Sequence, residues 1–109
     1  PGLIRVNDEP FTKPIILWPD RVEEWDVIDP SKLTEADFGF LKAAEGEPAE
    51  VLLIGTGASM QFMPPALRDA IRALGPVPDA MDTGAACRTY NVLLAEGRPI
   101  AAALLPVPI

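Results

Sequence analysis

Residues 51–57 read VLLIGTG, a run of four branched apolar residues followed by two glycines around a threonine. An unbroken apolar run is typical of a strand buried on both faces of a sheet, and the glycines predict a tight turn at its end. Residues 82–91 read DTGAACRTYN and show the same transition, which here opens directly into a helix. Neighbouring parallel strands end at one edge of an α/β sheet, where such sheets bind ligands. We therefore expect the two turns to lie side by side at that edge.

Two helices are predicted by their start and stop signals. The first begins after Thr34, an N-cap with Asp37 as a capping-box partner, and it ends at Gly46. The second begins at prolines 64–65, because the fixed φ of proline suits the first helical turn. Residues 75–76, Gly-Pro, end this second helix.

A third helix is predicted over residues 84–96, with Asp82 or Thr83 as its cap. Strands are predicted on either side of it, at residues 78–82 and 100–105. The last strand is rich in alanine, so another element is expected to pack closely on it. The order strand–helix–strand–helix–strand predicts an α/β sheet.

The first part of the chain, residues 3–29, looks extended. Prolines at positions 10, 14 and 19 remove hydrogen-bond donors, which predicts edge strands or a hairpin laid against the core. With 109 residues and nearly half of them hydrophobic, residues 1–109 are expected to form a single α/β domain.

Composition excludes several classes of function. The net charge of −7 disfavours binding to nucleic acid or to anionic lipid. The chain has no histidine, which removes Ser-His-Asp and Cys-His catalysis and the usual zinc ligand sets. No apolar run is long enough to cross a membrane. We expect no metal, no cofactor, no nucleic-acid partner and no direct membrane insertion.

The start of the chain and its single cysteine bear on localisation. One cysteine cannot form an internal disulfide, which favours a reducing compartment. The opening Pro1-Gly2-Leu3 resembles neither a signal peptide nor an Arg-rich transit segment. We expect a cytoplasmic protein, unless a leader has been removed.

The first candidate site is the glycine turn itself. Backbone amides at Gly55, Thr56 and Gly57 could approach a phosphate or another anion. The turn lacks the Lys of a Walker loop and the third glycine of a dinucleotide-binding fingerprint. The structural alternative, which we favour, is a tight turn that leaves a buried strand.

The second candidate site is the start of the third helix. The triplet Asp82-Thr83-Gly84 matches the aspartic-protease motif, but helical patterning follows it where that fold needs β-structure. The structural alternative is an N-cap at Asp82 or Thr83.

Three further polar residues follow on the same helix. Cys87 beside Arg88 could be an activated thiolate, although a buried inert thiol is the favoured interpretation. Arg88 and Asn91 could bind a carboxylate or phosphate, and Arg88 could equally pair with a surface acid.

A carboxylate cluster lies earlier in the chain, at Glu23, Glu24 and Asp26 around Trp25. Its neighbours suggest no metal geometry, so we interpret it as a solvated edge.

The motifs at residues 51–57 and 82–91, together with the ending EGRPIAAAL at residues 96–104, resemble a known family. Residues 5–7 and 25–26 add to the resemblance. The family is the Mth938-like family of unknown function, which includes mitochondrial complex I assembly factor three and the adipogenesis-associated Mth-domain protein. The resemblance implies a three-layer α/β fold with a mixed central sheet and an N-terminal β layer. It also implies, for the mitochondrial relatives, a chaperone-like role in complex I assembly through protein partners. For this chain it implies a cytoplasmic bacterial member, or alternatively a mitochondrial matrix protein whose leader has been removed. It carries over no catalytic residue.

Two functions follow from these observations. The first is a non-enzymatic domain that binds protein partners, in the manner of a respiratory complex assembly factor. The alternative is a small-molecule or anion-binding domain, or an enzyme, with its site between the two glycine turns. The residues of that alternative site are Gly55, Thr56, Gly57, Asp82, Thr83, Gly84, Cys87, Arg88 and Asn91.

Overall fold

The computed structural model describes residues 4–6, 9–11, 13–27, 33–43, 49–57 and 63–106. In chain order its elements are β1 (Ile4–Val6), β2 (Glu9–Phe11), β3 (Ile15–Trp18), β4 (Arg21–Glu24), η1 (Glu35–Phe38), α1 (Phe40–Ala43), β5 (Val51–Thr56), α2 (Pro65–Ala73), β6 (Val77–Met81), α3 (Thr83–Ala95) and β7 (Ile100–Leu105). The predicted strand at residues 51–54, the second and third helices and the last two strands are all present within a few residues of their expected bounds.

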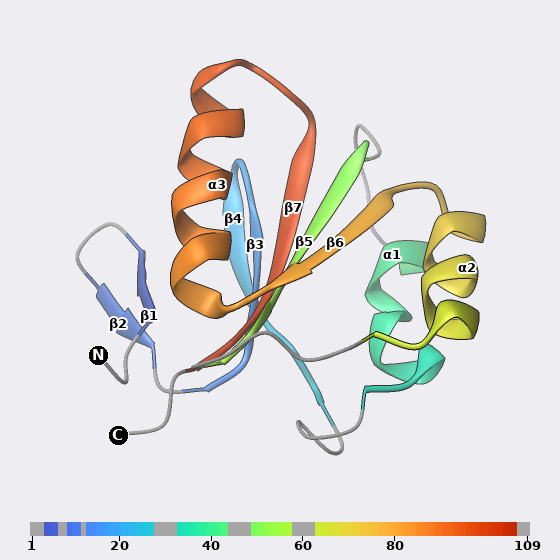
Figure 1. Cartoon of the computed structure of the whole chain (residues 1–109). Coiled ribbons are helices and arrows are strands. Elements are labelled where there is room, and N and C mark those ends of the chain that lie inside the picture. Colours follow the sequence, from blue (N-terminus) through green and yellow to red (C-terminus); the bar gives the residue numbers. More distant parts are fainter. Residues whose placement is uncertain are drawn as a thin grey trace.

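Five strands form one mixed sheet in the order β4-β3-β7-β5-β6 (Figure 1). β5 lies between β7 and β6 and is parallel to both. β3 is antiparallel to β7 and to β4. The parallel part explains the apolar run of β5, because a central parallel strand is covered on both faces. The expected α/β class with a mixed sheet is confirmed.

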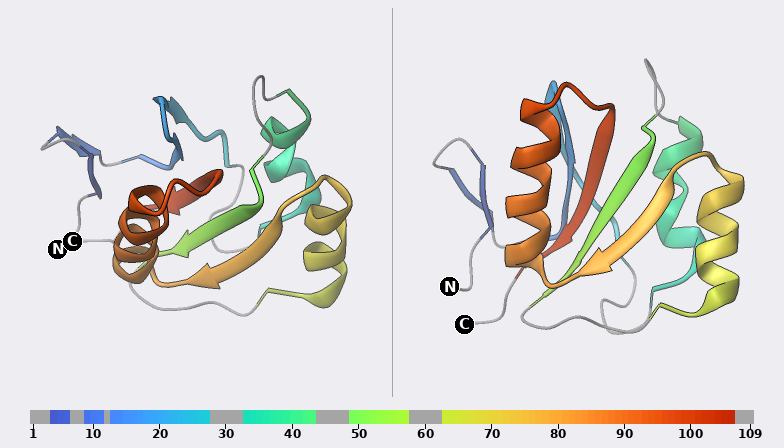
Figure 2. Two further views of the ribbon diagram at one scale, coloured as in Figure 1. Left: turned by 90° about the horizontal axis from the view of Figure 1, so that it is seen from above. Right: turned by 45° about the horizontal axis from the view of Figure 1, so that its top comes forward.

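Helices cover both faces of this sheet. α3 packs on one face, whereas η1, α1 and α2 lie on the other (Figures 1 and 2). Side chains alternate along β7 and so contribute to two cores, one on each face of the sheet. Ala102 lies in the core beneath α3 with Tyr90. Ala101 and Ala103 lie in the core on the other face with Phe38. All three alanines are fully buried. Their small side chains let both layers approach the central strand, as the alanine-rich pattern predicted.

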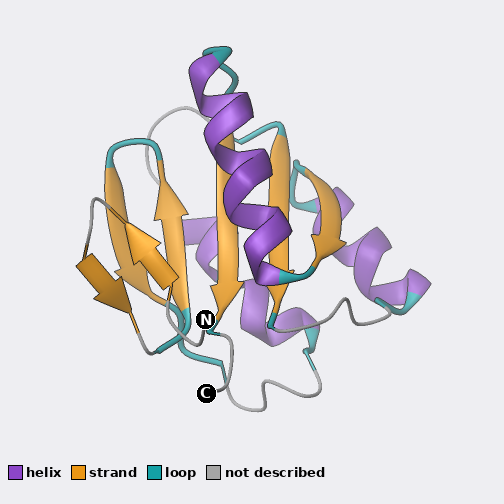
Figure 3. Cartoon of the chain, turned by 60° about the vertical axis from the view of Figure 1, so that its left-hand side comes forward, coloured by secondary structure: helices purple, strands orange, loops and turns teal. Residues whose placement is uncertain are grey.

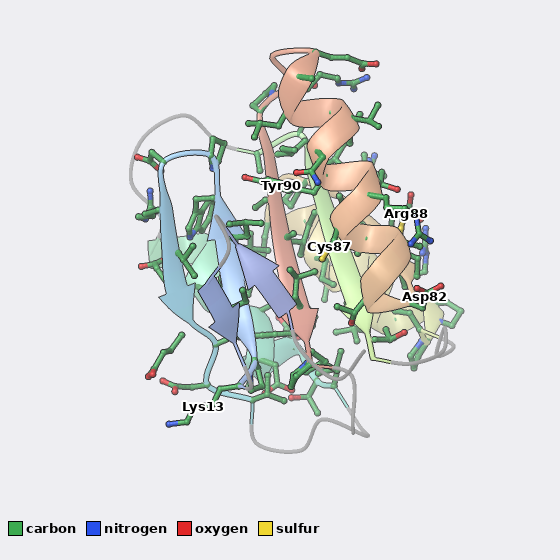
Figure 4. The ribbon with its side chains drawn as sticks, turned by 90° about the vertical axis from the view of Figure 1, so that its left-hand side faces the viewer. Lys13, Asp82, Cys87, Arg88 and Tyr90 are labelled. Carbon is green, nitrogen blue, oxygen red and sulfur yellow. The ribbon has the colours of Figure 1, made fainter. Side chains whose placement is uncertain are left out.

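The N-terminal β extension is a separate two-stranded sheet, in which β1 and β2 pair antiparallel. Figures 3 and 4 show this hairpin on the same face as α3, in front of β3 and β4. The predicted hairpin with an edge strand is present as β3 and β4, which pair antiparallel with β4 at the edge of the sheet. β3 itself has an interior place, because Pro14 precedes it and Pro19 follows it, so neither proline removes a donor within the strand.

The first predicted helix is also different from expectation. It forms as a 3-10 turn, η1, and a separate short helix, α1, with Gly39 between them. The predicted capping box is confirmed, because the Thr34 N–H donates to Asp37 Oδ2 at 2.8 Å. The predicted end at Gly46 lies outside the described residues.

Candidate functional site

The two motifs meet, as expected, where β5 ends and α3 begins. Asp82 is the N-cap of α3, and its carboxylate accepts a hydrogen bond from the Ala85 N–H at 2.8 Å. A carboxylate at this position also interacts favourably with the positive end of the helix dipole. The helix that follows excludes the β-structure that an aspartic protease would need after this triplet.

Thr83, the first residue of α3, is hydrogen-bonded to the residues where β5 and β7 end. Its N–H donates to the Gly57 carbonyl at 2.9 Å. Its hydroxyl accepts from the Gly57 N–H at 2.8 Å and donates to the Leu105 carbonyl at 2.6 Å. The side chain is 3% exposed. Thr83 therefore satisfies the backbone where β5 and β7 end, and fixes the start of α3 against both strands.

The two glycines of the first motif have different structural roles. Gly55 lies within β5 rather than in the turn, which corrects the prediction of a turn at residues 55–57. A Cβ on Gly55 would stand 2.9 Å from Thr83 Oγ1 and 2.9 Å from Leu104 Cδ2. Gly57 makes the turn with a φ of 96°, a conformation that favours glycine. The motif thus gives Thr83 room to pack directly on the end of the strand.

Thr56, the residue between these glycines, is also engaged within the fold. It is buried, and its hydroxyl donates to the Met81 carbonyl at 3.1 Å. This bond links the end of β5 to the end of β6, its parallel neighbour.

The remaining candidate residues lie on two flanks of α3. In Figure 4, Arg88 and Asp82 lie on one flank, and Cys87 and Tyr90 lie on the other, toward β3. The Arg88 Nη1 and the Asp82 Oδ1 stand 3.4 and 3.3 Å from the position of a Cβ on Gly84. The fold therefore gathers Asp82, Gly84 and Arg88, and it separates Cys87 from them.

Arg88 and Asn91 are both exposed to solvent. Within the part of the chain that the structure describes, no carboxylate forms an ion pair with Arg88.

Cys87 is half-buried against the core beneath α3. Burial raises the pKa of its thiol, and the positive charge of Arg88 opposes this only in part. A raised pKa keeps the thiol protonated near neutral pH, which disfavours a reactive thiolate.

Tyr90 was not among the predicted site residues, because it lies among apolar residues on α3. The residue is 3% exposed, and its buried hydroxyl has no hydrogen-bond partner among the residues that the structure describes. Burial, with a smaller contribution from the negative charge of Asp20, raises the pKa of Tyr90 to about 12. Its ring packs in the core between α3 and the sheet.

Within the described ranges, no group of three or more Cys, Asp or Glu side chains is arranged to hold a metal ion. None of the helices in these ranges has the length and apolar character to cross a bilayer.

A family described as "Protein of unknown function (DUF498/DUF598)" matches residues 1–105. The chain is 34% identical over 108 residues to an uncharacterized protein of Rhodobacter capsulatus, covering 99% of this chain and 81% of that protein. It is 35% identical over 95 residues to NADH dehydrogenase (ubiquinone) 1 alpha subcomplex assembly factor 3 of Mus musculus. That match covers 87% of this chain but 51% of the mouse protein, so the chain spans about half of that relative.

Solved structures show the same fold. A crystal structure of a Bordetella parapertussis protein has a TM-score of 0.85 and 39% identity, covering 96% of this chain and 88% of that one. A solution NMR structure from Bordetella pertussis, described as a Mth938-like domain, has a TM-score of 0.79 and 33% identity. It covers 98% of this chain and 82% of that one.

Proposed function

The chain belongs to the DUF498/DUF598 family, and from this premise we propose that it is a non-enzymatic protein-binding domain that assists the assembly of a respiratory complex such as complex I. The proposal takes its biological context from the mouse relative, whose name is that of an assembly factor. It takes its physical support from the junction of β5, β7 and α3.

The observation that carries the proposal is how the polar groups at that junction are used. A small-molecule site at the end of β5 would need free backbone amides and side chains. Here the Gly57 N–H and the Thr83 hydroxyl bond to each other, and the Asp82 carboxylate caps α3. These groups hold the fold together, which favours a function at the outer surface of the molecule.

The test is depletion of the protein from cells that make it, followed by native gel electrophoresis of their respiratory complexes. We expect loss of assembled complex I with accumulation of partial assemblies. A tagged, cross-linked chain should co-purify with subunits of those partial assemblies. Normal levels of every respiratory complex, with no subunit enriched over an untagged control, would overturn the proposal.

One observation favours the alternative of a small-anion site. Arg88 is exposed, and its guanidinium lies beside Gly84 in the first turn of α3. An arginine at a helix N-terminus attracts phosphates and carboxylates, although the Asp82 carboxylate at the same turn opposes them.

A thermal-shift screen against phosphates, nucleotides and small carboxylates tests this alternative. A ligand at about a hundred times its dissociation constant stabilises the fold by about 2.7 kcal/mol. A shift that disappears in Arg88→Ala, but persists in Arg98→Ala, would support the anion site. A blank screen would leave Gly84 and Arg88 without a ligand role.

A further inference from the structure

The two outer strands of the five-stranded sheet differ in what they offer to a partner. β6 forms one end of the sheet and β4 forms the other. An outer strand has backbone N–H and C=O groups that no neighbouring strand uses, and another chain can pair with them. Which of the two edges can accept a strand follows from the residues at each.

The β6 edge is blocked by its own sequence. The Val77 N–H donates inward to the Glu50 carbonyl at 2.8 Å, so the backbone of the next residue, Pro78, faces outward. Proline has no N–H to donate at that position. β6 also packs against α2. This edge therefore offers little to an added strand.

The β4 edge has its hydrogen-bonding groups intact. The Trp25 N–H donates to the Pro14 carbonyl at 3.0 Å, which sets the alternation along the antiparallel pair of β3 and β4. By that alternation, the backbone groups of Val22 and Glu24 face away from β3. Figure 3 shows β4 at the margin of the sheet. Within the described residues, no strand pairs with its outer side.

The side chains of β4 specify the chemistry of the strand that would pair with it. Val22 is 36% exposed and lies opposite Leu17 on the α3 face of the sheet. Glu24 shares that face, is exposed and forms no ion pair with another described residue. Glu23, on the opposite face, is already engaged by the Trp18 indole and by Arg21. Among the described residues, the side chains of this edge that remain available to a partner are thus one apolar residue and one carboxylate, two positions apart.

A second copy of this chain does not suit the edge. Two β4 strands paired about a twofold axis would bring their carboxylates together, and like charges opposite one another are destabilising. The net charge of −7 adds a general repulsion between copies. Opposite charge is required, and it must come from a different protein.

We propose that the outer edge of β4 binds an extended segment of a partner protein that carries a β-branched residue beside Val22 and a lysine or arginine beside Glu24. The segment adds a sixth strand through the backbone of Val22 and Glu24. This inference rests on the proposed protein-binding function and names the surface and the partner chemistry. A single added strand buries a small interface, which is typical of the transient contacts that an assembly factor needs.

The direct test uses a defined probe, the fluorescein-labelled peptide Thr-Val-Thr-Lys-Thr-Val-Thr-Lys-Thr. It places Val and Lys alternately on one face, at the spacing of Val22 and Glu24. We expect saturable binding by fluorescence anisotropy, weakened by added salt. The same peptide with both lysines replaced by glutamate should bind about tenfold more weakly, because an attractive cross-strand pair becomes repulsive. Equal binding of the two peptides, or no binding of the lysine peptide, would overturn the proposal.

Two variants locate the binding at β4. Val22→Pro removes the outward N–H without removing a bond to β3, and we expect at least a tenfold loss of affinity. Val22→Thr keeps the N–H and the β-branched shape, and it should bind within about twofold of the original chain. Glu24→Lys, at an exposed position, should reverse the preference toward the glutamate peptide even if Val22→Pro proves poorly folded. Binding that neither Val22→Pro nor Glu24→Lys alters would place the peptide elsewhere and exclude this edge.

The same variants separate this inference from the proposed function. If cross-linked subunits still co-purify with both Val22→Pro and Glu24→Lys, the assembly function stands and the β4 edge is the wrong surface. If the lysine peptide binds at β4 while the depleted cells assemble every complex normally, the surface stands and the assembly function fails.

Discussion

Thr83 is the residue on which the junction of β5, β7 and α3 most depends. Thr83→Val keeps the shape but leaves the Gly57 N–H and the Leu105 carbonyl without their partner in a buried place. Each unsatisfied group costs about 1–3 kcal/mol, so we expect urea denaturation to show a loss of about 2–4 kcal/mol in the free energy of unfolding. Thr83→Ser keeps the hydroxyl and should lose about 1 kcal/mol through its missing methyl group. Equal losses in the two variants would mean that the hydroxyl bonds contribute little.

Tyr90 gives the chain a specific sensitivity to alkaline pH. The folded state holds its pKa at about 12, above its ordinary value of 10. Between these values the unfolded chain releases this proton while the folded chain keeps it, so stability is full below about pH 10 and falls as the pH rises toward 12. A difference of this size corresponds to roughly 3 kcal/mol over the whole interval between the two values. Tyr90→Phe should remove that part of the decline, as measured by urea denaturation at pH 9 and pH 11.5.

A spectroscopic titration checks the cause of this pH dependence. The chain has one tyrosine, so the ultraviolet absorbance of tyrosinate reports Tyr90 alone. In the folded state we expect the absorbance to rise near pH 12, and in urea near pH 10. A folded-state rise near pH 10 would show that the hydroxyl reaches solvent. Tyr90→Phe should also retain full stability at neutral pH, because the buried hydroxyl that it removes has no partner within the described part of the chain.

At the level of the elements, Gly39 and Gly55 should respond oppositely to the same substitution. Gly39 has helical backbone angles between η1 and α1, and the nearest atom to an added Cβ, the Ala36 carbonyl oxygen, is 3.5 Å away. Gly39→Ala should stabilise the fold by about 0.4–1 kcal/mol, because alanine restricts the unfolded chain. Gly55→Ala forces a Cβ against Thr83 and Leu104 within β5 and should cost about 1–3 kcal/mol. Thermal melts of the two variants, which add the same single methyl group, compare the two sites directly. Destabilisation by Gly39→Ala would mean that the break between η1 and α1 needs glycine.

Sequence patterns predicted a helix or strand well where a few neighbouring residues determine it. The apolar run of β5, the two prolines at the start of α2 and the Asp82 cap of α3 all act over a few neighbouring residues. The interior place of β3 could not be found in this way, because Ile15 pairs with Leu104 near the other end of the sequence. The role of Thr83 was concealed for the same reason, since its hydroxyl bonds to Leu105, 22 residues away. The assembly function rests on the relatives and stays a proposal.

Considered as a whole, the molecule depends on β7, which lies between β3 and β5 and has a core on each of its faces. Ala102 faces α3, whereas both tryptophans, Trp18 and Trp25, lie in the core on the opposite face. Ala102→Leu overpacks the α3 side and should cost about 1–3 kcal/mol. Because the two cores share one strand, we expect them to unfold together.

Tryptophan fluorescence and far-ultraviolet circular dichroism measure this coupling. In Ala102→Leu the two unfolding transitions should shift to lower urea by the same amount, although the substituted side chain lies on the face away from the tryptophans. Val92→Ala, at an exposed position of α3, is the matched control and should change stability by less than about 0.5 kcal/mol. If Ala102→Leu left the fluorescence transition in place while circular dichroism moved, the α3 layer would be unfolding on its own. The central strand would then not couple the two faces, and the sheet would have to be treated as two independent cores.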